Sequence, residues 1–148
     1  MADKTLTLNN GACRVFVYGS LKKDHSNHGL LDEYRMVCRD SITGPYRMYS
    51  LGYFPGVVDV GADEGLATIY GEVYEVDEEG LGALDLLEGH PSFYCRERMK
   101  TDEGIRVWMY VLQGWNKRAS EEVDGMWLPT DEELEYWSGE AKDAEGAA

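Results

Sequence analysis

The stretch ATIYGEVYEVDEEGLGALDLLEG, residues Ala67–Gly89, places a predicted strand directly before a predicted helix. β-Branched and aromatic side chains dominate Ala67–Val76, which favours a strand, and Gly71 within it indicates a bulge or a close approach of another part of the chain. Asp77 is a typical N-cap, acids follow it in the first helical turn, and Gly89 is a typical helix end. This segment therefore predicts a fold that combines strands with helices.

Most other apolar segments have the pattern of strands. Cys13–Tyr18 is a short apolar run typical of a buried strand, and residues 39–60 read as short strands separated by glycine and proline. Phe93–Lys100 and Ile105–Leu112 alternate in polarity, and the TDEG between them is a hairpin signal. Consecutive strands with few helices predict an α+β fold with a curled or barrel-like sheet.

Two further short helices are predicted. The first follows the opening strand, has Ser26 or Asn27 as its candidate cap, and is indicated by four apolar residues at helical spacing: Leu30, Leu31, Tyr34 and Val37. The second covers Thr130–Trp137, where Glu133 stands three residues after Thr130 in the pattern of a capping box.

Length and charge bound the domain organisation. A chain of 148 residues suits a single domain. We expect a core over about residues 13–118 and an acidic extension over about 119–148, of which 139–148 are expected to be disordered. The formal net charge is −14, and residues 121–148 hold ten acids and one lysine. Such an acidic segment favours solubility and by itself indicates no partner.

Composition excludes several classes of function. The chain has no basic stripe, which binding to a phosphate backbone requires, so no direct nucleic-acid affinity is expected. No apolar stretch approaches the roughly 20 residues that span a bilayer, and the opening MADKTLTLNNGA lacks the apolar centre of a signal peptide. We therefore expect a cytoplasmic protein without a membrane partner.

The three cysteines are far apart, which favours packing roles over disulfides or zinc ligation. The oligomeric state is left open.

Glu88 departs from the pattern of its helix. On a helical wheel of residues 78–88 it falls between Leu81 and Leu84, on the face expected to be buried. It also lies in the last turn, where the helix dipole disfavours negative charge. Both effects would raise the pKa of its carboxyl group, and such local departures tend to mark functional sites. The alternatives are a partly exposed glutamate at a frayed helix end, or Asp85 at the edge of the same face, which is more simply a solvated residue.

The opening strand ends at Tyr18-Gly19-Ser20-Leu21. Glycine permits a sharp turn with positive φ, which would leave the N–H groups of Gly19, Ser20 and Leu21 without partners in the sheet. A concave set of such amides can hold a carboxylate without an arginine. The spacing matches neither a P-loop nor a GxSxG elbow, so Ser20 is a poor candidate for an acyl nucleophile. The alternative is a plain strand-to-loop turn.

The polar residues after this turn predict no metal site. His25 and His28 are three residues apart, but the remaining histidine is His90 and no carboxylate stands at a matching ligand spacing, so structural or surface roles are expected. Lys22 and Lys23 are expected to be solvated and could steer an anion toward the turn.

Four motifs occur in a fixed order: FVYGSLKKDHSNHGLL (16–31), GYFPGVV (52–58), YGEVYEVDEEGLGALDLLEGHPSFYCRE (70–97) and VWMYV (107–111). Together they resemble the γ-glutamylcyclotransferase-like family, and more narrowly its branch of γ-glutamylamine cyclotransferases and AIG2-like proteins. The resemblance covers about residues 13–115 and implies a compact mixed barrel with flanking helices. Residues 59–66 and the acidic end carry no motif of this family.

The resemblance also implies roles for the residues singled out above. In this family the turn holds the glutamyl part of the substrate, which corresponds here to Tyr18, Gly19, Ser20 and Leu21. The catalytic carboxylate corresponds to Glu88. No cofactor or metal is implied, and the expected partner is a small-molecule γ-glutamyl substrate.

The implied reaction is intramolecular lactam formation. The α-amine of a γ-glutamyl amide attacks its own γ-carbonyl, an amine leaves, and 5-oxoproline forms, with Glu88 as general base and then general acid. Tyr94 and Tyr110 could add hydroxyl contacts, although packing within strands is the simpler role. Three alternatives stay open: a non-catalytic relative that sequesters or senses a small ligand, an interaction domain acting through its acidic tail, and an enzyme for a γ-glutamyl group on a larger amine.

Overall fold

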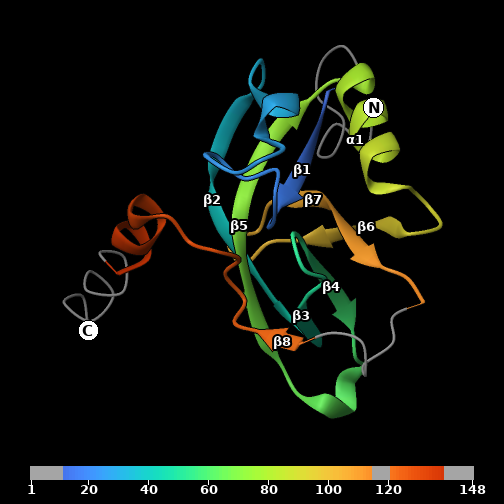
Figure 1. Cartoon of the computed structure of the whole chain (residues 1–148), viewed down its shortest axis with the longest axis vertical. Helices are drawn as coiled ribbons and strands as arrows, with labels where there is room; N and C mark the ends of the chain where they lie inside the picture. Colours follow the sequence, from blue (N-terminus) through green and yellow to red (C-terminus); the bar gives the residue numbers. More distant parts are fainter. Residues whose placement is uncertain (1–11, 115–120, 139–148) are drawn as a thin grey trace.

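The computed structural model describes residues 12–114 and 121–138. Its strands are β1 Cys13–Val17, β2 Arg35–Gly44, β3 Tyr46–Ser50, β4 Pro55–Asp59, β5 Ala67–Val76, β6 Tyr94–Lys100, β7 Arg106–Leu112 and β8 Glu121–Val123. Its helices are α1 Glu78–Glu88, the 3-10 turns η3 His28–Leu31 and η4 Ala62–Glu64, and a helix over 131–138 (Figure 1). The predicted α+β class is confirmed.

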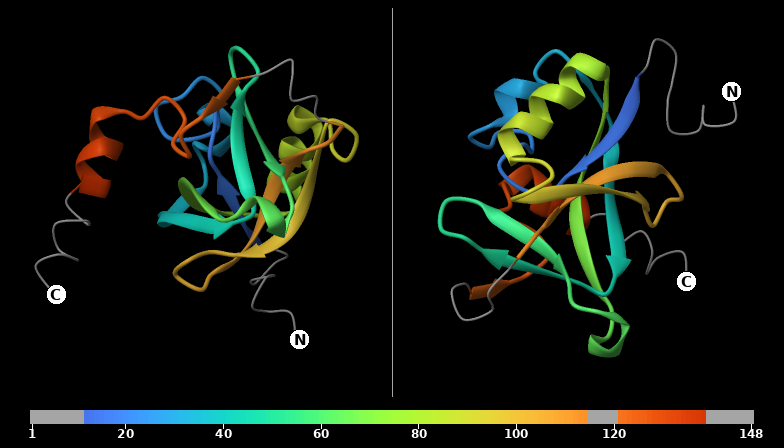
Figure 2. Two further views of the ribbon diagram at one scale, coloured as in Figure 1. Left: turned by 90° about the horizontal axis from the view of Figure 1, so that it is seen from below. Right: turned by 90° about the vertical axis from the view of Figure 1, so that its right-hand side faces the viewer.

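The described strands form two sheets. The larger has the order β2-β5-β1-β7-β6, in which β1 pairs antiparallel with β5 and parallel with β7. The smaller has the order β4-β3-β8 and is antiparallel throughout. The two sheets curl toward each other, because β3 contacts β5 and β4 contacts β7, and they do not join into one closed barrel within the described strands (Figure 2). The prediction of a barrel-like sheet therefore agrees with the curvature of the sheets but not with a closed barrel.

Strand β1 runs through the centre of the larger sheet and is buried on both faces. Val15 and Val17 belong to the core cluster that includes Leu31 of η3 and Leu84 of α1. Phe16 points to the other face, into a second cluster that contains residues of the smaller sheet. Because both faces are covered, the strand reads as a continuous apolar run instead of an alternating one. Its C-terminal end consequently lies deep inside the molecule.

Helix α1 has the predicted boundaries and caps. The Asp77 side chain accepts a hydrogen bond from the Gly80 amide, and Gly89 closes the helix with φ 65°. Leu84 is buried in the first core cluster, and Leu81 packs against it. The helix lies beside η3 at one end of the larger sheet (Figure 2).

Strand β5 also has the predicted boundaries, and Gly71 marks a close approach. A side chain at this position would overlap the carbonyl oxygen of Val17 and come within 2.7 Å of the Phe16 ring. The predicted strand-like segment 39–60 is three strands, but β2 begins earlier, at Arg35. The predicted hairpin turn at residues 101–104 is confirmed by the bond from the Thr101 amide to the Ile105 carbonyl.

The helix predicted around residues 30–37 is wrong in length and type. It is the single 3-10 turn η3, after which the chain enters β2. Asn27 occupies the N-cap position without a capping side-chain bond, because its amide nitrogen donates instead to Ser20 Oγ at 2.9 Å. Tyr34 lies beyond the end of η3, and its hydroxyl group donates a hydrogen bond to the side chain of Asp77, the N-cap of α1.

The C-terminal segment is packed more closely than a separate extension would be. Strand β8 pairs with β3, and Trp127 is 5% exposed in the second core cluster, beyond the predicted core limit at 118. The predicted capping box is confirmed, because Thr130 Oγ1 accepts from the Glu133 amide and Glu133 accepts from the Thr130 amide. Residues 139–148, predicted to be disordered, lie outside the described residues. No described helix has the length and apolar character needed to cross a bilayer.

Candidate functional site

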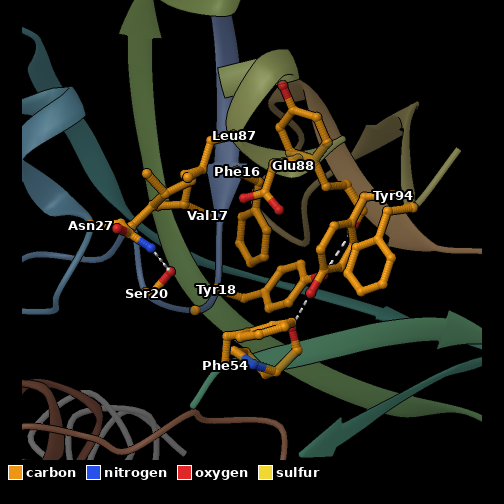
Figure 3. A pocket seen from close by; sticks show the side chains of 14 residues that line it. Phe16, Val17, Tyr18, Ser20, Asn27, Phe54, Leu87, Glu88 and Tyr94 are labelled. Atoms are coloured by element: carbon orange, nitrogen blue, oxygen red, sulfur yellow. Dashed lines mark hydrogen bonds between the residues drawn. The ribbon is translucent and has the colours of Figure 1, made fainter. Parts of the chain in front are cut away.

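A cavity of about 230 Å³ opens where β1 ends. The turn Tyr18–Leu21 forms one wall, the last turn of α1 brings Glu88 to the opposite side, and Tyr94 of β6 closes another side. The carboxylate of Glu88 points into this space, toward Phe16 and Tyr18 (Figure 3). The structure thus brings together all five residues that the sequence singled out, although 67 or more positions separate the turn from Glu88 in the chain.

The turn after β1 presents unused backbone donors. The amides of Gly19, Ser20 and Leu21 donate to no acceptor within the described part of the chain, whereas the amides of Lys22 and Lys23 bond to the Gly19 carbonyl and to a glutamate side chain. Three neighbouring residues that line the cavity therefore each retain a free N–H group. Such donors can bind a carboxylate or a developing oxyanion.

Gly19 is needed for a reason that differs from the expected one. It does not adopt a positive φ. A side chain at this position would instead come within 2.7 Å of the Pro55 ring at the start of β4. The glycine therefore lets the turn pack closely against β4, which fixes this wall of the cavity.

Glu88 is half-buried, and its carboxyl group lies in a poorly hydrated environment. Removal from water raises its pKa to about 7, from an ordinary 4.5. It has no hydrogen-bond or ion-pair partner among the described residues, so no cation stabilises its charged form. A carboxyl group of this kind can accept and release a proton near neutral pH.

Two tyrosines in the cavity wall use their hydroxyl groups to fix the backbone. Tyr18 donates to the Tyr110 carbonyl at 2.7 Å, and Tyr94 donates to the Pro55 carbonyl at 2.6 Å (Figure 3). Burial, followed by the charge of Glu88, raises the pKa of Tyr94. Both phenols therefore stay protonated at neutral pH, and their protons are engaged in holding the wall together.

Asp85, the rival candidate, is engaged elsewhere. Arg96 Nε donates to its Oδ1 at 2.8 Å and the Tyr110 hydroxyl donates to the same atom at 2.7 Å. Although burial raises its pKa, these two bonds and the Arg96 charge outweigh that effect, and the pKa of Asp85 lies below its ordinary value. The expectation of a solvated flank residue is therefore wrong. Asp85 is ionised at neutral pH and accepts the hydroxyl bond of Tyr110, which lines the cavity.

The expectation that Lys22 is solvated is also wrong. Its side chain is 0% exposed, and its ammonium group donates to Glu133 Oε2 at 2.7 Å and to the Trp127 carbonyl at 2.8 Å. Lys23 is half exposed and pairs with Glu132 at 3.1 Å. The two lysines therefore anchor the turn to the C-terminal segment. A pair 111 residues apart leaves no local signal in the sequence, apart from the capping box that contains Glu133.

A second buried acid, which the sequence reading missed, also holds the turn. Glu72 of β5 is 1% exposed, and its Oε1 accepts bonds from the Lys23 amide at 2.8 Å and from the Tyr74 hydroxyl at 3.0 Å. His28 completes this support, because its Nδ1 lies 2.9 Å from the Leu21 carbonyl, to which it donates. The sequence does contain a signal for this residue, because Glu72 is an acid among apolar residues in the predicted strand Ala67–Val76.

The other two histidines also contact neighbouring residues. His25 Nε2 lies 3.5 Å from Glu133 Oε1, and His90 accepts a bond from the Arg96 amide. No group of three or more potential metal ligands occurs within 12–114 and 121–138. The three cysteines form no disulfide.

Comparisons with known proteins give a consistent result. The family "Gamma-glutamyl cyclotransferase, AIG2-like" matches residues 15–129. The Gamma-glutamylcyclotransferase family protein YtfP of Escherichia coli (strain K12) is 36% identical over 118 residues, which are 80% of this chain and 98% of that protein. The solution structure of protein ytfP from Escherichia coli superposes with a TM-score of 0.59 at 35% identity, over 78% of this chain and 96% of the other.

A crystal structure of an AIG2-like protein from Mus musculus superposes with a TM-score of 0.63. The superposition covers 81% of this chain and 97% of the mouse protein. At 23% sequence identity this likeness shows that the two proteins share a fold.

Proposed function

The chain belongs to the gamma-glutamyl cyclotransferase, AIG2-like family, and from that premise we propose that it releases an amine from a γ-glutamyl amide by intramolecular lactam formation, with Glu88 as the proton carrier. The observation that carries the proposal is the position of Glu88. A carboxyl group with a pKa of about 7 shares a small cavity with three free backbone donors.

The reaction forms one bond and breaks another. The α-nitrogen of the substrate attacks the γ-carbonyl carbon, a tetrahedral intermediate forms, and the bond from that carbon to the leaving nitrogen breaks. Of the three protons on the α-ammonium nitrogen, one remains on the lactam nitrogen of 5-oxoproline and two end on the leaving amine, which departs as an ammonium ion. The step consumes no water and needs no oxidant or reductant.

Glu88 has the properties that this proton transfer requires. Its ionised form removes a proton from the α-ammonium group, and the resulting acid then protonates the leaving nitrogen. A carboxylate with an ordinary pKa would be too weak a base to remove this proton efficiently, because the α-ammonium group is a much weaker acid than a carboxylic acid. The raised pKa of Glu88 makes both directions of transfer accessible.

The turn after β1 supplies the second requirement. The free N–H groups of Gly19, Ser20 and Leu21 can bind the glutamyl carboxylate and the developing negative charge on the γ-oxygen. A bent glutamyl chain held in this way presents its amine to its own carbonyl, and correct positioning supplies much of the acceleration of an intramolecular reaction.

The test is a mass-spectrometric screen of purified protein with a panel of γ-glutamyl amides. We expect 5-oxoproline and the free amine in equal amounts. Glu88→Gln keeps the shape of the side chain and should lower kcat about 10²- to 10⁴-fold. Glu79→Gln, an exposed acid on the same helix, is the matched control and should retain full turnover. Full activity of Glu88→Gln would refute its role, and tight binding without any turnover by the wild type would favour a sequestering or sensing protein.

A further inference from the structure

Three large apolar side chains stand at the mouth of the cavity, next to Glu88. Phe54 is 36% exposed, Leu87 43% and Phe93 47%, and all three line the cavity. We call these residues the apolar rim. Figure 3 shows Leu87 and Phe54 around the space into which Glu88 points. Apolar side chains of this size gain free energy from burial, so a cluster left open beside a cavity offers binding energy to a ligand.

The rim is assembled from three separate parts of the chain. Phe54 precedes β4, Leu87 lies in the last turn of α1, and Phe93 precedes β6. The rings of Phe54 and Phe93 meet edge to face at 6.2 Å, and Phe93 meets the Tyr94 ring at 5.0 Å. These contacts form a continuous aromatic wall from the interior of the cavity to its mouth.

The charge of the cavity restricts what this wall can receive. Among the described residues that line it, Glu88 is the one charged side chain, and none is lysine, arginine or histidine. The three free amides of the turn can receive one carboxylate, that of the glutamyl group. A second carboxylate on the leaving part would meet no cation, within a protein of net charge −14.

We infer that the leaving part of the substrate is an apolar amine, with an aryl or alkyl group that contacts Phe54, Leu87 and Phe93 and without a carboxylate of its own. This inference rests on the proposed function and narrows its substrate class. The glutamyl part occupies the polar end of the cavity, between the turn and Glu88. The scissile bond lies at the boundary between the polar and the apolar ends.

Three amides test the inference with the full chain: γ-glutamylbenzylamide, γ-glutamylmethylamide and γ-glutamylglycine. We expect kcat/KM to fall in that order, with the benzylamide about 10- to 100-fold above the methylamide because its ring is buried against the rim. The glycine derivative should be the poorest, because its carboxylate is unpaired. Equal or better turnover of the glycine derivative would overturn the inference and leave the proposed function standing.

A pair of adjacent aromatic residues supplies a matched variant and control. Phe54→Ser should lower kcat/KM for the benzylamide about 10-fold. The ratio of kcat/KM for the benzylamide to kcat/KM for the methylamide should therefore become smaller. Tyr53→Ser changes a neighbouring ring that is 96% exposed and does not line the cavity, and should keep the wild-type ratio. Phe54→Leu retains an apolar side chain and should restore most of the preference. An unchanged ratio in Phe54→Ser would overturn the inference.

Binding measurements separate this inference from the proposed function. Calorimetry with Glu88→Gln reports the affinity for each intact amide without turnover. We expect the benzylamide to bind at least about 10-fold more tightly than γ-glutamylglycine. If the wild type turns over none of the three amides but this preference is seen, the proposed function fails and the inference stands. If the two affinities are equal, the inference fails whatever the turnover.

Discussion

At the scale of single residues, Glu88 determines how the proposed activity depends on pH. Its pKa is raised to about 7 because its carboxyl group is removed from water. The ionised form is the base, so we expect kcat/KM for a good γ-glutamyl amide to rise as the pH increases through about 7. Initial rates between about pH 5 and pH 9 would locate the rising limb. A limb near the ordinary glutamate pKa of 4.5 would contradict the role of burial.

The same residue should reduce the stability of the folded protein at high pH. Because the folded pKa lies above the unfolded value, the folded state binds more protons between pH 4.5 and about 7, and stability falls as the pH rises through that range. Glu88→Gln removes this cost and should be more stable than the wild type by about 1–3 kcal/mol near pH 8.5. The gain should shrink toward pH 5. Urea denaturation of both proteins at the two pH values measures it, and a gain independent of pH would point to packing instead.

Sequence patterns predicted a buried face for Glu88 but a solvated Lys22, and the difference between these outcomes is physical. A glutamate between two leucines on one helix face is a local pattern, because residues three and four apart share that face. A buried lysine is recognised only through its partner, and Glu133 lies 111 residues away. Phe54 was equally hidden, since its place in the cavity depends on how β4 packs against the turn after β1.

At the scale of elements, the pair Lys22–Glu133 joins the turn after β1 to the helix over 131–138. Both side chains are nearly inaccessible, so loss of one charge leaves the other buried without a partner. Glu133→Gln can keep the capping-box bond from the Thr130 amide through its one side-chain oxygen. It loses the charge, and an amide NH₂ group replaces the oxygen that faces the Lys22 ammonium group. We expect it to lower the free energy of unfolding by about 3–5 kcal/mol at pH 7. Urea denaturation monitored by tryptophan fluorescence measures the change.

The neighbouring acid is the control for this prediction. Glu132 pairs with Lys23 and Arg39 at the surface, and solvent screens its interactions. Glu132→Gln should therefore change stability far less than Glu133→Gln. Hydrogen bonds and the Lys22 charge outweigh burial and lower the pKa of Glu133, so its contribution should be present above pH 4.5 and lost as the pH falls further. Equal effects of the two substitutions would show that the pair is not insulated from solvent.

The elements that sequence predicted well are those with strong local signals. Strand β5 and helix α1 have the expected boundaries because composition, cap and terminal glycine all agree. The segment after the opening strand has apolar residues at helical spacing, from Leu30 to Val37, yet the structure forms only η3. Side-chain bonds to the turn after β1 outweighed the pattern there: His28 donates to the Leu21 carbonyl, and the Asn27 side-chain amide donates to Ser20 Oγ.

At the scale of the whole molecule, the arrangement of two curled sheets brings distant segments together around one cavity. The parallel pairing of β1 with β7 and the contact of β4 with β7 place the turn, Tyr94 and Phe54 on adjacent walls. Sequence predicted the class of the fold but not these pairings, because strand partners that are far apart in the chain leave no local pattern. The acidic C-terminal segment is part of this arrangement, although Glu133 lies beyond the residues that the family matches.

A double-mutant cycle tests whether this segment is thermodynamically integral to the molecule. Lys22→Met should destabilise the protein because it leaves the Glu133 carboxylate buried without its ammonium partner. In the Glu133→Gln background the Lys22 ammonium group is already buried without a charged partner. Lys22→Met removes that unpaired charge, so it should lower the free energy of unfolding much less than in the wild type, or raise it. We expect a coupling energy of about 2–3 kcal/mol between the two positions, measured as the non-additivity of their free energies of unfolding. Additive effects would mean that the Lys22–Glu133 pair does not couple the C-terminal segment to the turn after β1.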